Sequence, residues 1–138
     1  MSAARVFIDT NIFVYLYSSS SVDWTKRRRA HEALAQFDCQ ISTQVINEFC
    51  HVCTKKANIP TETLLNTISH ICSYRDLSHI DEETIESALM LRAKYGYAYY
   101  DSLILASALE QDCTYLLSED FADGQVIEGS MTIKNIFA

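Results

Sequence analysis

The chain has 138 residues, of which 49% are hydrophobic and 21% are charged. This length and composition are typical of one folded domain and exclude a disordered chain, so we predict a single domain over residues 1–138. The formal net charge of −7 opposes tight binding of long nucleic acids in general, unless cations bound by carboxylates reverse the sign of the charge locally.

The N-terminal residues are expected to begin the fold rather than to form a leader, because Asp9 and Asn11 interrupt their apolar run. No stretch of the sequence approaches the roughly 20 apolar residues of a membrane span. The five cysteines are an odd number at scattered positions, which does not resemble a disulfide framework. Free thiols in a reducing compartment fit better, so we expect a cytoplasmic protein with no membrane partner.

The first third of the chain predicts a strand followed by two helices. Val6–Ile8 is short, apolar and partly β-branched, as in a buried strand. Asn11 suits the N-cap of a helix that begins at Ile12. After a loop at Ser18–Ser21, apolar residues recur at helical spacing between Trp24 and Phe37.

The middle of the chain repeats this alternation. Cys39–Ser42 predicts a second strand, and Ser42 or Thr43 is the candidate cap of the next helix. Pro60 fits the first turn of another helix. Four residues form the apolar stripe expected for that helix: Leu64, Leu65, Ile68 and Ile71.

The last part of the chain completes an alternation of strands and helices. Asp76–Ile80 is a weak strand candidate, and Asp81 is the expected cap of a helix with acidic residues in its first turn. Asp101–Gln111 predicts a helix, and Thr114–Leu117 and Met131–Ile133 predict strands. This order predicts βαβ units, which means an α/β fold with a mostly parallel sheet and helices on both faces.

Four acidic residues occupy positions near the carboxyl ends of the predicted strands, where parallel α/β sheets place their chemistry. Asp9 ends the first strand, and Asp120 follows the strand that closes at Leu117. Glu48 and Asp101 lie on helices that begin near strand ends. Each acid taken alone has an ordinary explanation, such as a helix cap or a helical glutamate.

Together these acids would repel one another, at about 4 kcal/mol for two charges about 4 Å apart in an effective dielectric near 20. Such a cluster needs cations or protons to neutralise it, and hard oxygen ligands suit Mg²⁺ or Mn²⁺. A metal held there would lower the pKa of a bound water, which Glu48 would hold or deprotonate.

The order of four short motifs resembles that of the PIN-domain nucleases, and within them the VapC-type toxins of toxin–antitoxin pairs. The motifs are Phe7–Asn11, Asn47–Phe49, Tyr100–Ile104 and Leu117–Asp120. The resemblance covers positions 6 to about 121. It implies a three-layer α/β/α fold with a five-stranded parallel sheet, and a Mg²⁺- or Mn²⁺-dependent endoribonuclease inhibited by an antitoxin. A homodimer is also a habit of that family.

Carried over by position, the resemblance implies that Asp9, Glu48 and Asp101 bind the metal and that Asp120 is a fourth acid. Glu119 and Asp123 compete with Asp120 for that place. Three further residues match polar positions that support the carboxylates: Thr10, Asn11 and Ser118.

Three other signals carry less weight. Cys50 and Cys53 have the C-x-x-C spacing of redox and zinc sites, but they share an apolar helical stripe and are expected to be buried core thiols. The basic run Lys26–Arg29 fits either a grip on phosphates or a solvated helix face. Core packing is expected for most of the tyrosines between Tyr95 and Tyr100, although some could stack on a base.

Two other functions compete with the nuclease. A haloacid-dehalogenase-type phosphatase also places an aspartate after its first strand, but it needs a second acid two residues later, where this chain has Asn11. A catalytically inactive PIN-like scaffold that binds RNA or protein is the other alternative, and it would gain nothing from keeping four mutually repelling acids. Neither the RNA target nor the number of metals follows from the sequence.

Overall fold

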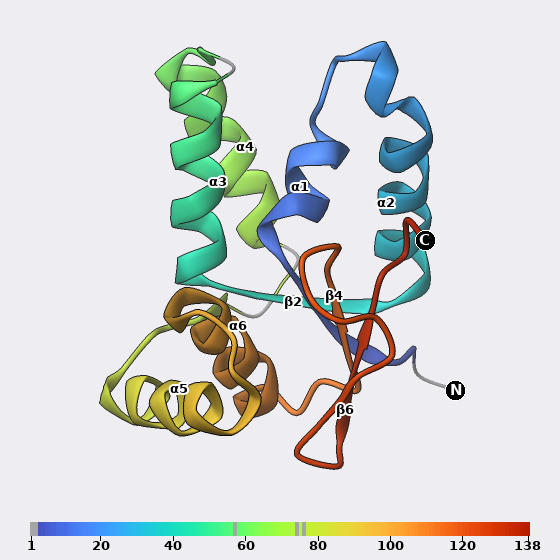
Figure 1. Cartoon of the computed structure of the whole chain (residues 1–138). Helices are drawn as coiled ribbons and strands as arrows, with labels where there is room; N and C mark the ends of the chain where they lie inside the picture. The colour runs from blue at the N-terminus through green and yellow to red at the C-terminus, as the bar shows by residue number, and fades with distance from the viewer. Residues whose placement is uncertain (1–2, 57, 74, 76) are drawn as a thin grey trace.

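In the computed structural model, which describes residues 3–56, 58–73, 75 and 77–138, strands and helices alternate along the chain (Figure 1). The strands are β1 (Arg5–Ile8), β2 (Asp38–Ser42), β3 (Leu77–Ser78), β4 (Tyr115–Leu117), β5 (Val126–Ile127) and β6 (Met131–Lys134). The helices are α1 (Thr10–Leu16), α2 (Trp24–Gln36), α3 (Thr43–Lys55), α4 (Thr61–Ser73), α5 (Glu82–Tyr95) and α6 (Tyr99–Glu110), with a 3₁₀ turn at Ser21–Asp23.

The six strands form one sheet in the order β3-β2-β1-β4-β6-β5. All neighbours are parallel except β5 and β6. The central strand β1 pairs with β2 on one side and with β4 on the other, and Phe7 is the partner of both Gln40 and Leu116. The carboxyl ends of three neighbouring strands therefore lie at the same edge, with Asp9 in the middle.

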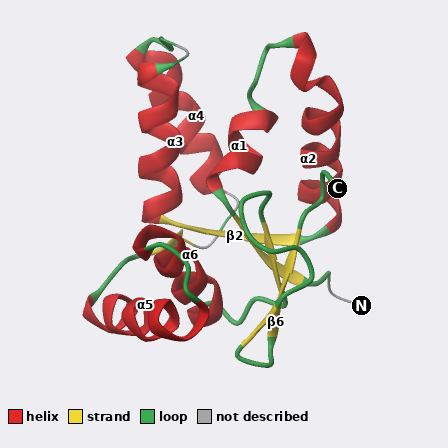
Figure 2. Cartoon of the chain, in the orientation of Figure 1, coloured by secondary structure: helices red, strands yellow, loops and turns green. Residues whose placement is uncertain are grey.

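Helices cover both faces of this sheet, as predicted. In Figures 1 and 2, α1 to α4 lie on one side of β2, and the pair α5 and α6 lies on the other. Every residue of helix α6 from Ser102 to Ala108 is buried. One face of α6 lies toward the sheet, and α5 packs on the opposite face of α6. Small side chains such as Ala106 and Ala108 permit this close packing. The three-layer α/β/α arrangement is confirmed.

The sheet has six strands where five were expected. The additional strand, β5, is two residues long and pairs antiparallel with β6, through a turn in which Glu128 and Gly129 both have positive φ. A two-residue strand is too short to show a period of alternating apolar residues, so no sequence pattern predicts β5. Asp76, in the predicted strand that became β3, lies outside the described residues.

Two helix details also differ from expectation. The N-cap of α1 is Asp9 rather than Asn11, because the Asp9 carboxylate accepts the backbone N–H of Thr10 and the helix begins there. On α4, Leu64 and Ile71 are buried, but Leu65 is 63% exposed and does not belong to the apolar face. In the part of the chain that is described, no helix is both long and apolar enough to cross a membrane.

The neighbouring leucines of α4 offer a matched test of this packing. Leu64→Ala should lower the free energy of unfolding by about 2–5 kcal/mol, because it leaves a cavity in the core. Leu65→Ala makes the same change on the exposed side and should alter stability by about 0.5 kcal/mol or less. Chemical denaturation measures both values, and equal losses in the two variants would contradict this placement of α4.

Candidate active site

Asp9 follows the fully buried segment Val6–Ile8 and lies at the edge of the sheet. Its backbone N–H donates to the carbonyl of Leu117 at 3.1 Å, which continues the pairing of β1 with β4 by one residue. The side chain is only 6% exposed. Its Oδ1 accepts the N–H of Thr10 and its Oδ2 accepts the hydroxyl of Ser118, both at 2.7 Å. Two hydrogen bonds therefore fix the orientation of this buried carboxylate.

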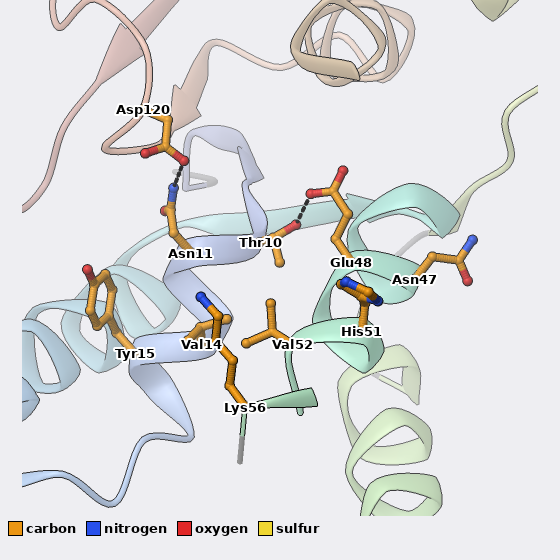
Figure 3. A pocket seen from close by; sticks show the side chains of 10 residues that line it. All are labelled: Thr10, Asn11, Val14, Tyr15, Asn47, Glu48, His51, Val52, Lys56 and Asp120. Carbon is orange, nitrogen blue, oxygen red and sulfur yellow. Dashed lines mark hydrogen bonds between the residues drawn. The ribbon is translucent and has the colours of Figure 1, made fainter. Parts of the chain in front are cut away.

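Glu48, on α3, is held by donors from two helices. Thr10 Oγ1 donates to its Oε2 at 2.9 Å (Figure 3), and Gln44 Nε2 donates to its Oε1 at 2.8 Å. Gln44 Nε2 also donates to the carbonyl of Tyr100 at 2.9 Å, immediately before Asp101. Gln44 thus connects α3 with the start of α6. Sequence reasoning missed this residue, although its position four residues before Glu48 places both on one helix face.

Asp120 lies after β4 and is held from α1. Asn11 Nδ2 donates to Asp120 Oδ2 at 2.9 Å (Figure 3), and the Asp120 backbone N–H donates to Ser118 Oγ at 3.1 Å. Because Ser118 also donates to Asp9, its buried hydroxyl links the two acids. Thr10, Asn11 and Ser118 therefore hold the carboxylates that they were predicted to support.

The two competitors of Asp120 point elsewhere. Glu119 accepts the hydroxyl of Tyr15 at 2.6 Å and forms an ion pair with Lys26 at 2.9 Å, so its charge is compensated from α2. Asp123 Oδ1 accepts the backbone N–H of Asn135 at 2.8 Å near the C-terminus. Asp120, by contrast, lines the same cavity as Glu48. The structure therefore favours Asp120 as the fourth acid.

Asp101, in the first turn of α6, completes the group and is only partly exposed. Among the residues that the structure describes, none donates a hydrogen bond or forms an ion pair with its carboxylate. Burial raises its pKa above the ordinary value, and the charges of Asp120 and Glu48 raise it further. Asp101 is thus close enough to two of the other acids to be affected by their charge.

Asp9 carries the largest electrostatic cost of the group. Burial raises its pKa from 3.8 to about 7, against the lowering effect of the hydrogen bonds from Ser118 and Thr10. The charges of Glu48 and Asp120 add to the rise. At neutral pH the metal-free site is therefore unfavourable in its fully ionised form.

A hard divalent cation fits the chemistry of this site. Carboxylate oxygens are the ligands that Mg²⁺ and Mn²⁺ prefer, and a cation would offset both the burial of the Asp9 charge and its repulsion by Glu48 and Asp120, which together raise the pKa of Asp9. Two buried acceptors beside the acids, Asn11 Oδ1 and Gln44 Oε1, have no hydrogen-bond partner among the described residues, and water on a hydrated cation would donate to such atoms. Within the same described part, no three His, Cys, Asp or Glu side chains already converge as a ligand set.

The basic run is used inside the protein. Lys26 pairs with Glu119, and the guanidinium of Arg27 donates to the carbonyl of Ser18. Arg28 pairs with Glu32 four residues later on α2, and Arg29 donates to the carbonyl of Ile136. Lys26, Arg27 and Arg29 therefore connect α2 with other segments, whereas Arg28 and its partner lie on the exposed face of the helix.

The C-x-x-C pair lies in the interior, as expected. Cys53 is buried and Cys50 is partly buried on α3, and burial raises the pKa of both thiols. A reactive thiol needs a lowered pKa, and neither residue belongs to a metal ligand group among the described residues. These cysteines contribute packing rather than chemistry.

Comparison with known proteins gives a consistent picture. The PIN domain family matches residues 6–122. Similar solved structures include a toxin–antitoxin complex from Klebsiella pneumoniae, with 22% identity and a TM-score of 0.71 over 95% of this chain and 97% of that chain. The sarcin-ricin loop cleaving toxin VapC20 of Mycobacterium tuberculosis has 13% identity and a TM-score of 0.66 over 83% and 91%.

A third similar structure is VapBC2 from Rickettsia felis, bound to a DNA fragment from its promoter. It has 14% identity and a TM-score of 0.65 over 95% of this chain and 99% of that chain. At these identities the likeness shows a shared fold. A comparison with curated proteins found no match.

The raised pKa of Asp9 makes the stability of the metal-free protein depend on pH. The folded state binds this proton more tightly than the unfolded state, so folding stability falls as the pH rises from about 4 to about 7. The loss from this one group should approach about 4 kcal/mol above pH 7. Asp9→Asn removes the charge at nearly constant volume. The variant should therefore exceed wild type in stability at pH 7.5 and match it near pH 4, as measured by chemical denaturation in EDTA.

Mn²⁺ and a distant acid provide the controls. A cation that binds only the folded state should raise the melting temperature of wild type, and that of Asp9→Asn much less. Glu62→Gln, on the exposed side of α4, should change neither the pH dependence nor the response to Mn²⁺. If Asp9→Asn destabilises the metal-free protein at pH 7.5 and Mn²⁺ shifts both proteins alike, Asp9 is only a helix cap.

Proposed function

The chain belongs to the PIN-domain family, and we propose that it is a metal-dependent endoribonuclease that acts as the toxin of a toxin–antitoxin pair. The observation that carries the proposal is the proximity of Asp9, Glu48, Asp101 and Asp120: burial raises the pKa of Asp9 to about 7, and the charges of Glu48 and Asp120 add to the rise for both Asp9 and Asp101. A protein that needed only a scaffold would avoid this cost. We also propose that residues 1–138 fold as one domain, in the cytoplasm.

In this proposal the four acids hold Mg²⁺ or Mn²⁺. When bound there, the cation would make an attacking water more acidic and offset the negative charge that develops on the phosphate. Four carboxylates are compatible with one or two such ions.

The side chains around the acids orient them for the reaction. Asp9 and Asp120 are positioned through the shared hydroxyl of Ser118, while the amide of Asn11 holds Asp120. Glu48 is fixed by Thr10 and Gln44, and each of its oxygens keeps a lone pair with which to accept a proton from the attacking water. Fixed orientation of this kind reduces the reorganisation that hydrolysis of a phosphodiester would otherwise require.

A partner antitoxin is part of the proposal. Three similar structures bear on this point: the complex from Klebsiella pneumoniae, the VapBC2 structure and VapC20, which is described as a toxin that cleaves the sarcin-ricin loop. These names support a toxin with an antitoxin partner here, and a homodimer stays a prediction from the family resemblance. The inactive scaffold remains the competing hypothesis, whereas membership in the PIN family leaves the phosphatase without support.

A nuclease assay tests the proposed activity. The purified protein should cleave single-stranded or structured RNA with Mg²⁺ or Mn²⁺, and EDTA should stop the reaction. Asp9→Asn and Asp101→Asn should each abolish cleavage with unchanged circular dichroism, because each removes a carboxylate from the proposed metal site. Glu62→Gln should cut like wild type. Equal cleavage by wild type and both variants would reveal a contaminating nuclease and reject the site.

Expression in a bacterial host tests the proposed biological role. Wild type expressed alone should slow growth, because uncontrolled RNA cleavage depletes functional RNA, whereas Asp9→Asn should be harmless. Co-expression of the adjacent small gene should restore growth. Growth curves at matched protein levels measure this, and harmless expression of protein that is active in vitro would reject the toxin role while leaving the nuclease intact.

A further inference from the structure

Two cavities meet at the proposed active site. One, of about 590 Å³, lies between α1 and α3 and is lined by Asp120 and Lys56 among others (Figure 3). The other, of about 720 Å³, lies between α3 and the start of α6 and is lined by Tyr100. Asn47, Glu48 and His51 line both cavities. The two cavities therefore border each other across one face of α3, with the Glu48 carboxylate between them.

An exposed aromatic ring stands beside the acids in the second cavity. Tyr100 directly precedes Asp101 and is 68% exposed, while the rings of Tyr95, Tyr97 and Tyr99 pack against the core. Its backbone is held by the Gln44 amide at 2.9 Å, and its ring meets that of Tyr99 edge to face, with 5.5 Å between centroids. The ring is thus exposed on a firmly held backbone, which is what a stacking surface for a nucleic-acid base requires.

Lys56 lines the first cavity, on the other side of Glu48 from Tyr100, and His51 lines both cavities. Lys56 is exposed and extends from the end of α3 toward Val14 and Asn11 in Figure 3. In the described part of the chain, no acid forms an ion pair with it, whereas Lys26, Arg27 and Arg29 contact other segments of the fold. His51 follows Glu48 by three residues and is exposed to both cavities. An unpaired lysine close to a carboxylate site provides a local contact for a phosphate.

We propose that the two cavities form one groove for single-stranded RNA, in which Tyr100 stacks on a base on one side of the cleaved phosphate and Lys56 and His51 contact a phosphate on the other side. This rests on the proposed function. Single-stranded RNA fits because its bases are free to stack on an exposed ring, whereas the bases of a duplex are already stacked on one another. Recognition by stacking also tolerates many sequences, so Tyr100 would position the RNA rather than select one base.

Binding of a fluorescent single-stranded RNA hexanucleotide tests the groove, with anisotropy as the readout. To keep the RNA uncleaved, binding is measured under two conditions: with the wild-type protein as parent in EDTA, and with Asp9→Asn as parent in Mn²⁺. Tyr100→Leu should weaken binding about tenfold, whereas Tyr100→Phe keeps the ring and should bind within about twofold of its parent. Trp24→Leu removes an exposed ring from α2, away from the groove, and should have no effect.

Salt dependence tests the lysine separately. Lys56→Met should weaken binding and reduce the slope of log affinity against log salt by about 0.7, the value for one phosphate contact on a single strand. Lys55→Met changes the same charge one residue earlier on the chain, outside the groove lining, and should leave the slope nearly unchanged. His51→Gln should also weaken binding, because His51 lines both cavities.

The outcomes separate this proposal from the proposed function. If Tyr100→Leu and Lys56→Met bind as their parent does, or if a duplex of the same sequence binds as well as the single strand, the groove is not a path for single-stranded RNA. Cleavage that depends on Asp9 would then leave the nuclease standing. If instead no RNA is ever cut while Tyr100 and Lys56 still govern binding, the groove is supported and the nuclease fails.

Discussion

A carboxylate that is buried at the end of the central strand, within reach of the charges of two other acids, is stable only when something compensates it. Asp9 is in this position because β1 lies between β2 and β4, so the end of β1 cannot turn toward solvent. Desolvation is the largest cause of its raised pKa. The same sheet that stabilises the fold therefore creates the site where a cation would be most strongly favoured.

The donors that surround the proposed ligands are all neutral. Thr10, Gln44 and Asn11 donate from hydroxyl or amide groups, as does Ser118. A lysine in their place would cancel the negative charge that a metal needs. Lys26 is close by but pairs with Glu119, the acid next to Asp120. The charge of Glu119 is thus compensated by Lys26 and has a structural role. The charge of its neighbour Asp120 is not compensated and stays available to a metal.

Local sequence patterns predicted most of this arrangement. The strand before Asp9, the helix that carries Asp101 and the strand before Ser118 each have a clear apolar period, and they lie where expected. The predictions that failed concern features that depend on contacts between distant segments of the chain. Strand β5 exists only through its pairing with β6, and the exposure of Leu65 depends on how α4 lies against α3. The partners of Lys26, Arg27 and Arg29 come from loops and from the C-terminal segment, which no local period reveals.

The candidate site shows the same division between local and distant information. Motif order predicted four acids for the site, but it could not choose between Asp120, Glu119 and Asp123 for the fourth, since all three lie within a few residues of one strand end. Asp120 is favoured because Glu119 and Asp123 have partners from other parts of the chain, namely Lys26, Tyr15 and Asn135. Gln44 was missed for the same reason, because its second contact is the carbonyl of Tyr100 on another helix.

The net charge of −7 limits how such a protein can hold RNA. Attraction at long range would need a basic surface, but three residues of the four-residue basic run contact other segments of the fold and Arg28 pairs with Glu32. Affinity for the proposed substrate must then come from contacts at close range: a bound cation, one or two local charges such as Lys56, and stacking on Tyr100. Stacking is insensitive to the sign of the surrounding field, so it can act where net repulsion keeps long or duplex nucleic acids away. In the proposed nuclease, the negative net charge would weaken the overall attraction to RNA. The same charge would favour accessible single-stranded segments, because these can still bind through stacking at close range.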